Sequence, residues 1–332
     1  MVRKKRRKKR KLKKSVNKIL ILFFIIITVI IGYRVVKIKK TDLFQEVTQE
    51  NKEKDDKLYT EYTTCLTGKY QEEELNEVLQ NKIDELTDLL SKYHVSVGYE
   101  DIMTGFKYSY NSKTVYYAAS TVKVLDAIYA IDKYYNKELD LNEKVLFRAI
   151  YNIPNSKFLN KQQVGSYISI KDLVKNAVMV SDNAAHIILY DYFGYKNLKN
   201  YATSLGATNA LVGDQYGNIT INDALIYLKK LNELINKEES FGEEIKSWFT
   251  ESDENYIKTD TTKAAVKYGG YNEYFHNVGI VYADNPYYLV ILSTNGNNKS
   301  EKMIKEISSK VEELHSLFYS NRQEYCTFKV YN

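Results

Sequence analysis

With 332 residues, 44% of them hydrophobic, and only 2 Pro and 14 Gly, the chain is not low-complexity and has room for one large domain or two small ones plus appendages. Its net charge of +6 comes from residues 1–18, which hold twelve Lys or Arg and no acid, so the remaining residues sum to −6. Nucleic acid is therefore not expected as a partner, because a nucleic-acid-binding domain is normally basic in its folded part.

The chain begins with a basic tail, residues 1–18, followed by an almost continuously apolar stretch, residues 19–36. A helix of about 18 residues reaches roughly 27 Å, close to the hydrocarbon thickness of a bilayer. The twelve cations before this stretch outnumber the four that follow it, which places the N-terminus in the cytoplasm. We expect a single-pass anchor in the cell membrane. A cleaved signal peptide is disfavoured because no small-x-small site follows, and the apolar stretch argues against reading the basic run as a nuclear or nucleic-acid patch.

Residues 37–64 are polar and charged, and we interpret them as a linker that holds an extracytoplasmic domain, residues 65–332, away from the membrane. Cys65 precedes the first predicted helix of that domain and Cys326 follows the last. An extracytoplasmic location permits a disulfide between them, and two unpaired thiols are the alternative. Neither cysteine has a metal-binding spacing partner, and the four histidines are scattered. We therefore expect neither a metal nor another cofactor.

The folded part shows helical and strand periodicities in a distinctive order. A helix is followed by a two-stranded hairpin, a block of helices, three strands and a final helix; residues 139–168 favour no element. Strands from both chain ends with helices between them predict an α+β fold. In it, terminal helices flank one antiparallel sheet built from both ends, and an all-helical lobe is inserted. The predicted helices are 72–93, 124–131, 169–180, 184–193, 221–235 and 300–318, and the predicted strands are 95–101, 106–110, 264–270, 276–283 and 287–294.

Ser120 and Lys123 stand three positions apart at the start of a predicted helix. Residues at this spacing share a helix face, so the lysine can take the serine proton and make the hydroxyl a nucleophile. The spacing alone is weak, because Ser15 and Lys18 repeat it in the basic tail.

Two further motifs follow in the same chain. The triplet 181–183 (Ser-Asp-Asn) lies between two predicted helices, and the triplet 267–269 (Lys-Tyr-Gly) lies in a predicted strand. The order Ser-x-x-Lys, Ser-Asp-Asn, then Lys-Thr-Gly or a variant resembles the penicillin-recognising serine hydrolases, in particular the class A β-lactamase-like branch. The resemblance spans roughly residues 66–318. The alternative is that Ser120 and the first triplet only cap helices and that Lys123 is solvated.

The resemblance implies catalytic roles for three residues. Ser120 attacks an amide carbonyl and becomes acylated, and Lys123 takes its proton. Lys123 must then be neutral, and both burial and the positive charge of Lys267 would lower its pKa. Ser181 relays a proton to the leaving nitrogen.

It also implies a substrate-binding set. Asn183 hydrogen-bonds a substrate amide, and Lys267 attracts a substrate carboxylate beside Gly269. The backbone N–H groups of Ser120 and Gly270 bind the oxyanion, and the loss of one such donor typically costs about a hundred- to a thousandfold in rate.

The chain departs from this family in two places. Class A β-lactamases carry a glutamate in a Glu-x-x-Leu-Asn loop that activates the deacylating water, whereas no glutamate lies between Asn183 and Thr220. Residues 206–218, the matching segment, are short, and Asp214 is their only acid. Acylation should survive this loss and deacylation should be slow. In addition, Tyr268 replaces a small hydroxyl residue, which weakens the expected carboxylate recognition.

We therefore expect a membrane-anchored, extracytoplasmic and monomeric serine hydrolase. It would form an acyl-enzyme on Ser120 with β-lactams or with D-Ala-D-Ala-type peptides of peptidoglycan. A penicillin-binding D,D-carboxypeptidase or transpeptidase with slow deacylation is the alternative enzyme. A catalytically silent domain that binds cell-wall fragments is the alternative without catalysis.

Overall fold

The computed structural model describes residues 72–103, 105–257, 259 and 262–321, all of which belong to the unit Glu61–Asn332. The predicted basic tail, membrane anchor and linker, together with Cys65 and Cys326, lie outside the described residues and stay predictions. Within the described part of the chain, no helix is both long enough and apolar enough to cross a membrane.

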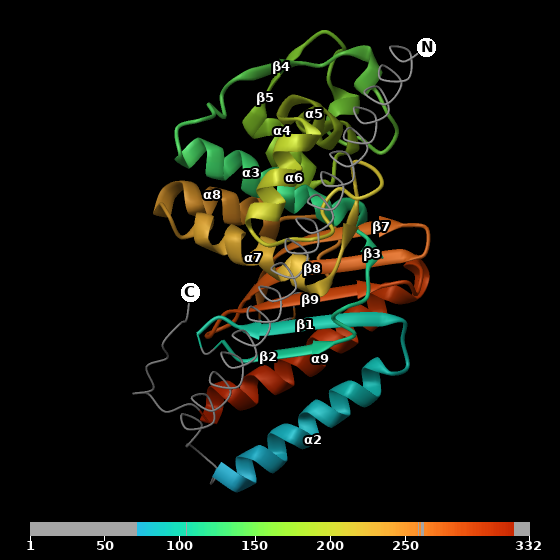
Figure 1. Ribbon diagram of the computed structural model, residues 1–332, viewed down its shortest axis with the longest axis vertical. Coiled ribbons are helices and arrows are strands. Elements are labelled where there is room, and N and C mark those ends of the chain that lie inside the picture. The colour runs from blue at the N-terminus through green and yellow to red at the C-terminus, as the bar shows by residue number, and fades with distance from the viewer. Residues whose placement is uncertain (1–71, 104, 258, 260–261, 322–332) are drawn as a thin grey trace, which may run out of the picture. The chain divides into compact units, whose positions relative to one another are not determined.

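A five-stranded antiparallel sheet forms the centre of the fold, in the order β2-β1-β9-β8-β7 (Figure 1). The first two strands come from the N-terminal side of the described residues and the other three from the C-terminal side. They meet where β1 pairs with β9, with Val97 opposite Ile291. The predicted α+β fold, with one sheet built from both chain ends, is therefore confirmed. The strands are β1 (Val95–Asp101), β2 (Lys107–Tyr110), β7 (Lys263–Tyr271), β8 (Tyr274–Tyr282) and β9 (Tyr287–Ser293).

Two helices, α2 (Glu72–Leu90) and α9 (Asn297–Asn321), lie side by side on one face of the sheet (Figure 1). Alternate residues of a strand point to opposite faces. Leu289 and Ile291 accordingly join the apolar core beneath these helices, whereas Val290 and Leu292 join the core of the helical lobe. Burial on both faces explains why the strands are nearly continuous apolar runs.

The inserted lobe covers the other face of the sheet and shares one apolar core with it. Helix α7 lies so close to β1 that a Cβ atom at Gly98 would approach the Cγ2 atom of Ile221 to 2.3 Å. The lobe's helices are α3 (Lys123–Tyr135), α4 (Ile170–Met179), α5 (Asn183–Phe193), α6 (Tyr195–Ser204), α7 (Ile221–Ile235) and α8 (Glu239–Thr250). Its short elements are the strand pairs β3 (Tyr116–Tyr117) with β6 (Asn218–Ile219) and β4 (Lys144–Leu146) with β5 (Tyr167–Ser169), and the 3₁₀ turns η1 (Ala119–Val122), η2 (Ala149–Tyr151) and η3 (Leu159–Lys161).

The predicted helices and strands all occur, with boundaries shifted by a few residues. Two helices, α6 and α8, were not predicted. Residues 139–168, which favoured no element, form only a short strand pair and 3₁₀ turns. Pieces of this length have little periodicity, so contacts with the rest of the lobe decide their conformation.

Candidate active site

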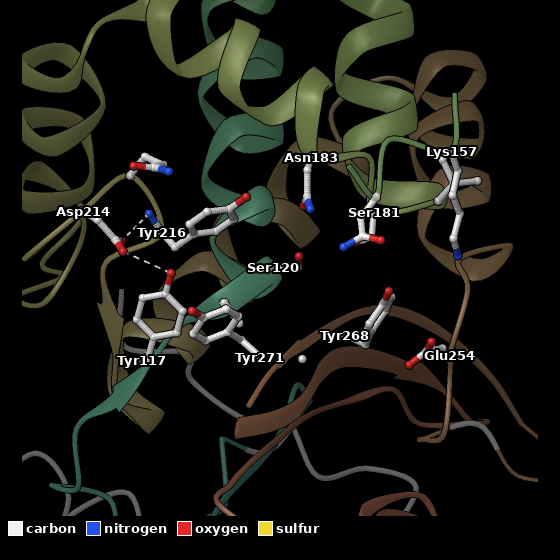
Figure 2. A pocket seen from close by; sticks show the side chains of 15 residues that line it. Tyr117, Ser120, Lys157, Ser181, Asn183, Asp214, Tyr216, Glu254, Tyr268 and Tyr271 are labelled. Atoms are coloured by element: carbon white, nitrogen blue, oxygen red, sulfur yellow. Dashed lines mark hydrogen bonds between the residues drawn. The ribbon is translucent and has the colours of Figure 1, made fainter. Parts of the chain in front are cut away.

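The candidate nucleophile lies in a strained turn between β3 and α3. Ser120 is the second residue of the 3₁₀ turn η1, so the helical segment begins one residue before the serine. Ala119 has a φ of 47°, a left-handed conformation that costs a residue with a side chain about 1–3 kcal/mol and is held only by its surroundings. Here the Thr121 amide and hydroxyl both donate to the Ala118 carbonyl, at 3.2 and 2.6 Å. Ser120 thereby lines a cleft of about 580 Å³ (Figure 2).

Lys123 is the first residue of α3 and is fully buried. Its Nζ atom lies 3.0 Å from the Ser120 Oγ atom, and it donates to the Ser181 carbonyl and to the Asn183 Oδ1 atom, each at 2.8 Å. These two oxygens have no proton and can only accept. A neutral amine has two N–H groups for them and keeps one lone pair, which is then free to face Ser120. The geometry suits a general base for the serine proton.

Burial lowers the pKa of Lys123 to about 7. Asp126 and Asp182 oppose this shift, and Lys157 adds to it by repulsion. We expected Lys267 to help lower the pKa of Lys123, but the cation that contributes is Lys157. The repulsion between Lys123 and Lys267 acts on the latter, whose pKa burial already holds well below its usual range. A buried lysine whose pKa lies close to neutral pH is suited to proton transfer.

The residues of the Ser-Asp-Asn triplet have different roles: the aspartate is structural, and the serine and asparagine contact Lys123. The Asp182 side chain caps α5 by accepting from the Ala185 amide at 2.8 Å, and its second oxygen accepts from the amides of Phe158 and Leu159 at 2.7 and 3.0 Å. The alternative prediction, that the triplet caps a helix, is thus confirmed for Asp182. Its two neighbours both contact Lys123. Ser181, like Ala119, is left-handed, with a φ of 55°.

Lys267 lies on β7, on the strand face that points toward the lobe. Its Nζ atom donates to the Ser181 hydroxyl at 3.0 Å, and the same hydroxyl oxygen lies 3.3 Å from the Lys123 Nζ atom. Ser181 therefore connects the two buried lysines. The Lys267 amine also lies 4.2 Å from the centre of the Tyr268 ring. The Tyr268 side chain, and not the amine, lines the cleft. Attraction of a substrate carboxylate by Lys267 stays a prediction.

The strand β7 and the turn η1 approach closely at Gly269. A Cβ atom at this position would lie 3.0 Å from the Ala118 carbonyl oxygen and 3.0 Å from the Thr121 amide nitrogen. The absent side chain lets the strand lie against the turn, so the next residue, Gly270, lines the cleft together with Ser120. The two predicted oxyanion donors thus share one cleft; their role stays a prediction.

One site residue, His276, was not assigned a role from the sequence. Its Nδ1 atom accepts from the Ser293 amide at 3.1 Å, so its Nε2–H group donates to the Tyr117 carbonyl at 2.9 Å. The ring thus ties the central sheet to the strand that leads into Ser120. Only the fold brings these segments together, and sequence spacing gives no signal of it.

Asp214 lines the cleft, but both of its carboxylate oxygens already accept hydrogen bonds. One oxygen accepts from the amides of Tyr216 and Gly217 at 2.8 and 2.9 Å, and the other accepts from the Tyr117 hydroxyl at 3.1 Å. In Figure 2 the Tyr216 ring lies between Asp214 and Ser120. The carboxylate therefore stabilises its own loop rather than facing the Ser120 hydroxyl.

Several other cleft residues were missed in the sequence, because they come from separate segments and follow no motif. They divide into an aromatic wall and a charged wall on either side of Ser120 (Figure 2). Tyr117 packs against Tyr216 and Tyr271, with ring centres 6.2 and 5.4 Å apart. The residues of the charged wall are Lys157 and Glu254.

The structure thus brings together Ser120, Lys123, Ser181, Asn183 and Lys267. The hydrogen bonds between them link three separate segments of the chain, around residues 120–123, 181–183 and 267. In the described part of the chain, no group of three or more His, Cys, Asp or Glu side chains is placed to hold a metal ion.

A serine hydroxyl beside a buried lysine, at the junction of an antiparallel sheet and a helical lobe, places the protein in the class of serine hydrolases. A family model described as "Beta-lactamase enzyme family" matches residues 79–314. The chain therefore belongs to the β-lactamase enzyme family. No curated protein matches it.

Solved structures share the fold at low sequence identity. The β-lactamase from Sphaerobacter thermophilus DSM 20745 is 18% identical, with a TM-score of 0.63 over 70% of this chain and 96% of that one. A PBP-A mutant, solved as an acyl-enzyme complex with penicillin G, is 15% identical, with a TM-score of 0.65 over 71% and 97%. The TLA-3 extended-spectrum β-lactamase is 22% identical, with a TM-score of 0.61 over 71% and 98%. At these identities the likeness shows the fold alone.

Proposed function

We propose that this serine hydrolase forms a covalent acyl-enzyme on Ser120 with β-lactams or with D-Ala-D-Ala-type amides of peptidoglycan. The observation that carries the proposal is the position of Lys123. Its amine is buried, 3.0 Å from the Ser120 hydroxyl, and its two nearest partners, at 2.8 Å, are oxygens that can only accept. A base held in this way can take a proton from the Ser120 hydroxyl and exchange one with the Ser181 hydroxyl at 3.3 Å.

The reaction then follows from the contacts. Lys123 takes the Ser120 proton as the oxygen attacks the carbonyl carbon, and the backbone amides of Ser120 and Gly270 stabilise the oxyanion. When the C–N bond breaks, the leaving nitrogen needs a proton. Ser181, whose hydroxyl lies 3.3 Å from the Lys123 amine, passes one on and is reprotonated from Lys123. The products are a serine ester and the free amine, and Lys123 is neutral again.

A penicillin-binding enzyme with slow deacylation is the second candidate, and one observation favours it over an efficient β-lactamase. Asp214, the only acid of residues 206–218, is held by three hydrogen bonds and is turned toward Tyr117. No glutamate stands in that segment. Residues 206–218 consequently supply no free carboxylate to activate the water that attacks the Ser120 ester.

We further propose that residues 19–36 anchor the chain in the cell membrane as a single span, with the catalytic domain on the extracytoplasmic side. The twelve cations before this apolar stretch support that orientation. The proposal also includes a monomer and a bridge between Cys65 and Cys326. Protease added to intact cells should then remove the catalytic domain and leave the N-terminal tail protected; protection of both parts would contradict the orientation.

Incubation of the full-length chain with a fluorescent penicillin tests the function. We expect a gel-stable adduct that is absent in Ser120→Ala and retained in Ser91→Ala, which alters an exposed serine at the end of α2. A long-lived adduct supports the penicillin-binding type, and rapid release of hydrolysed penicillin supports a β-lactamase. The absence of both adduct and hydrolysis would overturn the enzymatic proposal and leave the silent wall-binding domain.

A further inference from the structure

A buried acid–histidine pair lies one helical turn below the catalytic lysine and has no part in the reaction described above. Asp126 follows Lys123 by three residues on α3, and His186 follows Asn183 by three residues on α5. The His186 Nδ1 atom lies 2.6 Å from the Asp126 Oδ2 atom. The exposed fractions are 0% for the histidine and 1% for the aspartate.

The two helices are therefore joined by two successive rungs. The first is the Lys123–Asn183 hydrogen bond of 2.8 Å, and the second is the Asp126–His186 contact. Because residues at i and i+3 lie on one helix face, the second rung fixes the distance and rotation of the helices directly beneath the first. A change at the lower rung would move the amine relative to the Ser120 hydroxyl.

The geometry also assigns the charge of this pair. The His186 Nε2 atom is buried and has no hydrogen-bond partner in the described part of the protein. A protonated ring would leave a charged N–H group buried and unsatisfied, which is more costly than a neutral nitrogen. The neutral ring donates from Nδ1 to Asp126 and leaves Nε2 bare. The pair then carries one negative charge, on the carboxylate.

We propose that Asp126 and His186 are positioning residues that hold the α3 and α5 helices in register and control the charge that Lys123 carries. This inference rests on the proposed function, in which Lys123 is the base. Asp126 supplies a buried negative charge that favours the protonated amine, and the contact with His186 holds that carboxylate in place. Without the charge of Asp126, burial would drive Lys123 further toward the neutral state.

Other titratable groups face the same region and also affect the charge of Lys123 or lie against His186. Asp182 also attracts the proton of Lys123, and Lys157 opposes it; Lys267 contacts the amine through Ser181. The rings of Tyr216 and Tyr190 lie 4.9 and 6.4 Å from the ring of His186. Burial raises the pKa of both tyrosines, to about 12 for Tyr216, so both stay neutral across the range in which Lys123 titrates.

The first test is the pH dependence of acylation by fluorescent penicillin in the full-length chain. Asp126→Asn keeps a hydrogen-bond acceptor and removes the charge. We expect the acidic limb of the rate profile to move to lower pH by about one unit, since a neighbouring charge typically contributes that much or more. One pH unit below the native midpoint, the rate should rise about fivefold. Asp132→Asn, which removes an acid two turns further along α3, should leave the profile unchanged.

The second test does not depend on acylation. NMR titration of ¹³Cε-labelled lysines, with the Lys123 signal identified by its loss in Lys123→Arg, should show the same downward shift in Asp126→Asn. The imidazole ¹⁵N spectrum, assigned with His186→Gln, should show a neutral ring protonated at Nδ1. If wild type forms no adduct, the proposed function fails and this titration still decides the inference. An unchanged or upward Lys123 midpoint, or a doubly protonated His186 ring at neutral pH, would overturn it.

Discussion

The imidazole of His276 donates to the carbonyl oxygen of Tyr117 across 2.9 Å, three residues before the proposed nucleophile, Ser120. The other ring nitrogen accepts from the Ser293 amide on the neighbouring strand. The ring must therefore be neutral, because a protonated ring would have no acceptor at that nitrogen. Burial lowers the pKa of His276 to about 4, which keeps it neutral under ordinary conditions.

This histidine should make the protein sensitive to acid. Between its usual pKa of 6.5 and its folded pKa of about 4, the unfolded chain binds a proton that the folded chain does not. Stability then falls as pH falls through this window. From pH 7 to 4.5 the free energy of unfolding should drop by about 2–3 kcal/mol on account of His276 alone.

Urea unfolding at pH 7 and pH 4.5 measures this effect. Because other groups also titrate, the comparison is with His276→Gln, whose amide can still donate to Tyr117. The variant should lose about 2–3 kcal/mol less than wild type over the same interval. Equal losses in the two proteins would show that folding does not lower the pKa of His276.

The Lys123 amine should control the pH dependence of acylation. Only the neutral amine accepts a proton, and its pKa is lowered to about 7. The rate should therefore fall as pH falls through about 7. Lys123→Arg should reduce acylation at least about a hundredfold, because a guanidinium stays charged and cannot act as a base. Lys133→Arg, an exchange at a lysine ten positions further along α3, is the matched control. A Lys123→Arg protein that still acylates at the native rate would exclude the lysine as base.

The sequence predicted much of the fold and the central group of the candidate site for a physical reason. Long apolar stripes and alternating runs have a strong period, so the sheet and the longer helices were recognisable. Ser120, Lys123 and Ser181 were recognisable because their spacing on local elements is itself the motif. Helices α6 and α8 were missed: each is amphipathic, but tyrosines and charged residues obscure its stripe.

Contacts across the fold were not predictable in the same way. His276 reaches Tyr117 over 159 positions, and His186 reaches Asp126 over 60. A lone histidine in an apolar stretch looks the same in a sequence whether it bridges two segments or only fills space. The role of Asp214 was left open for a similar reason, since its partner Tyr117 comes from another segment.

Asp182 should be important for stability. Its side chain caps α5 and also holds the amides of Phe158 and Leu159. Asp182→Ala should lower the free energy of unfolding by about 2–4 kcal/mol, from the lost cap and from buried amides left without an acceptor. Asp182→Asn, which keeps an acceptor oxygen, should lose less. Urea unfolding of the three proteins checks the order, and equal stability of wild type and Asp182→Ala would contradict it.

Asp214 offers the sharpest test of slow deacylation. If its carboxylate activated the water that releases the acyl group, Asp214→Asn would prolong the penicillin adduct by about a hundredfold or more. The structure predicts no such change. The carboxylate is occupied by Tyr117 and by two backbone amides, and an asparagine oxygen can still accept from those amides. The adduct lifetime of Asp214→Asn, followed on gels after the free penicillin is removed, should stay within about twofold of wild type. A strongly prolonged adduct would instead identify Asp214 as the deacylating base.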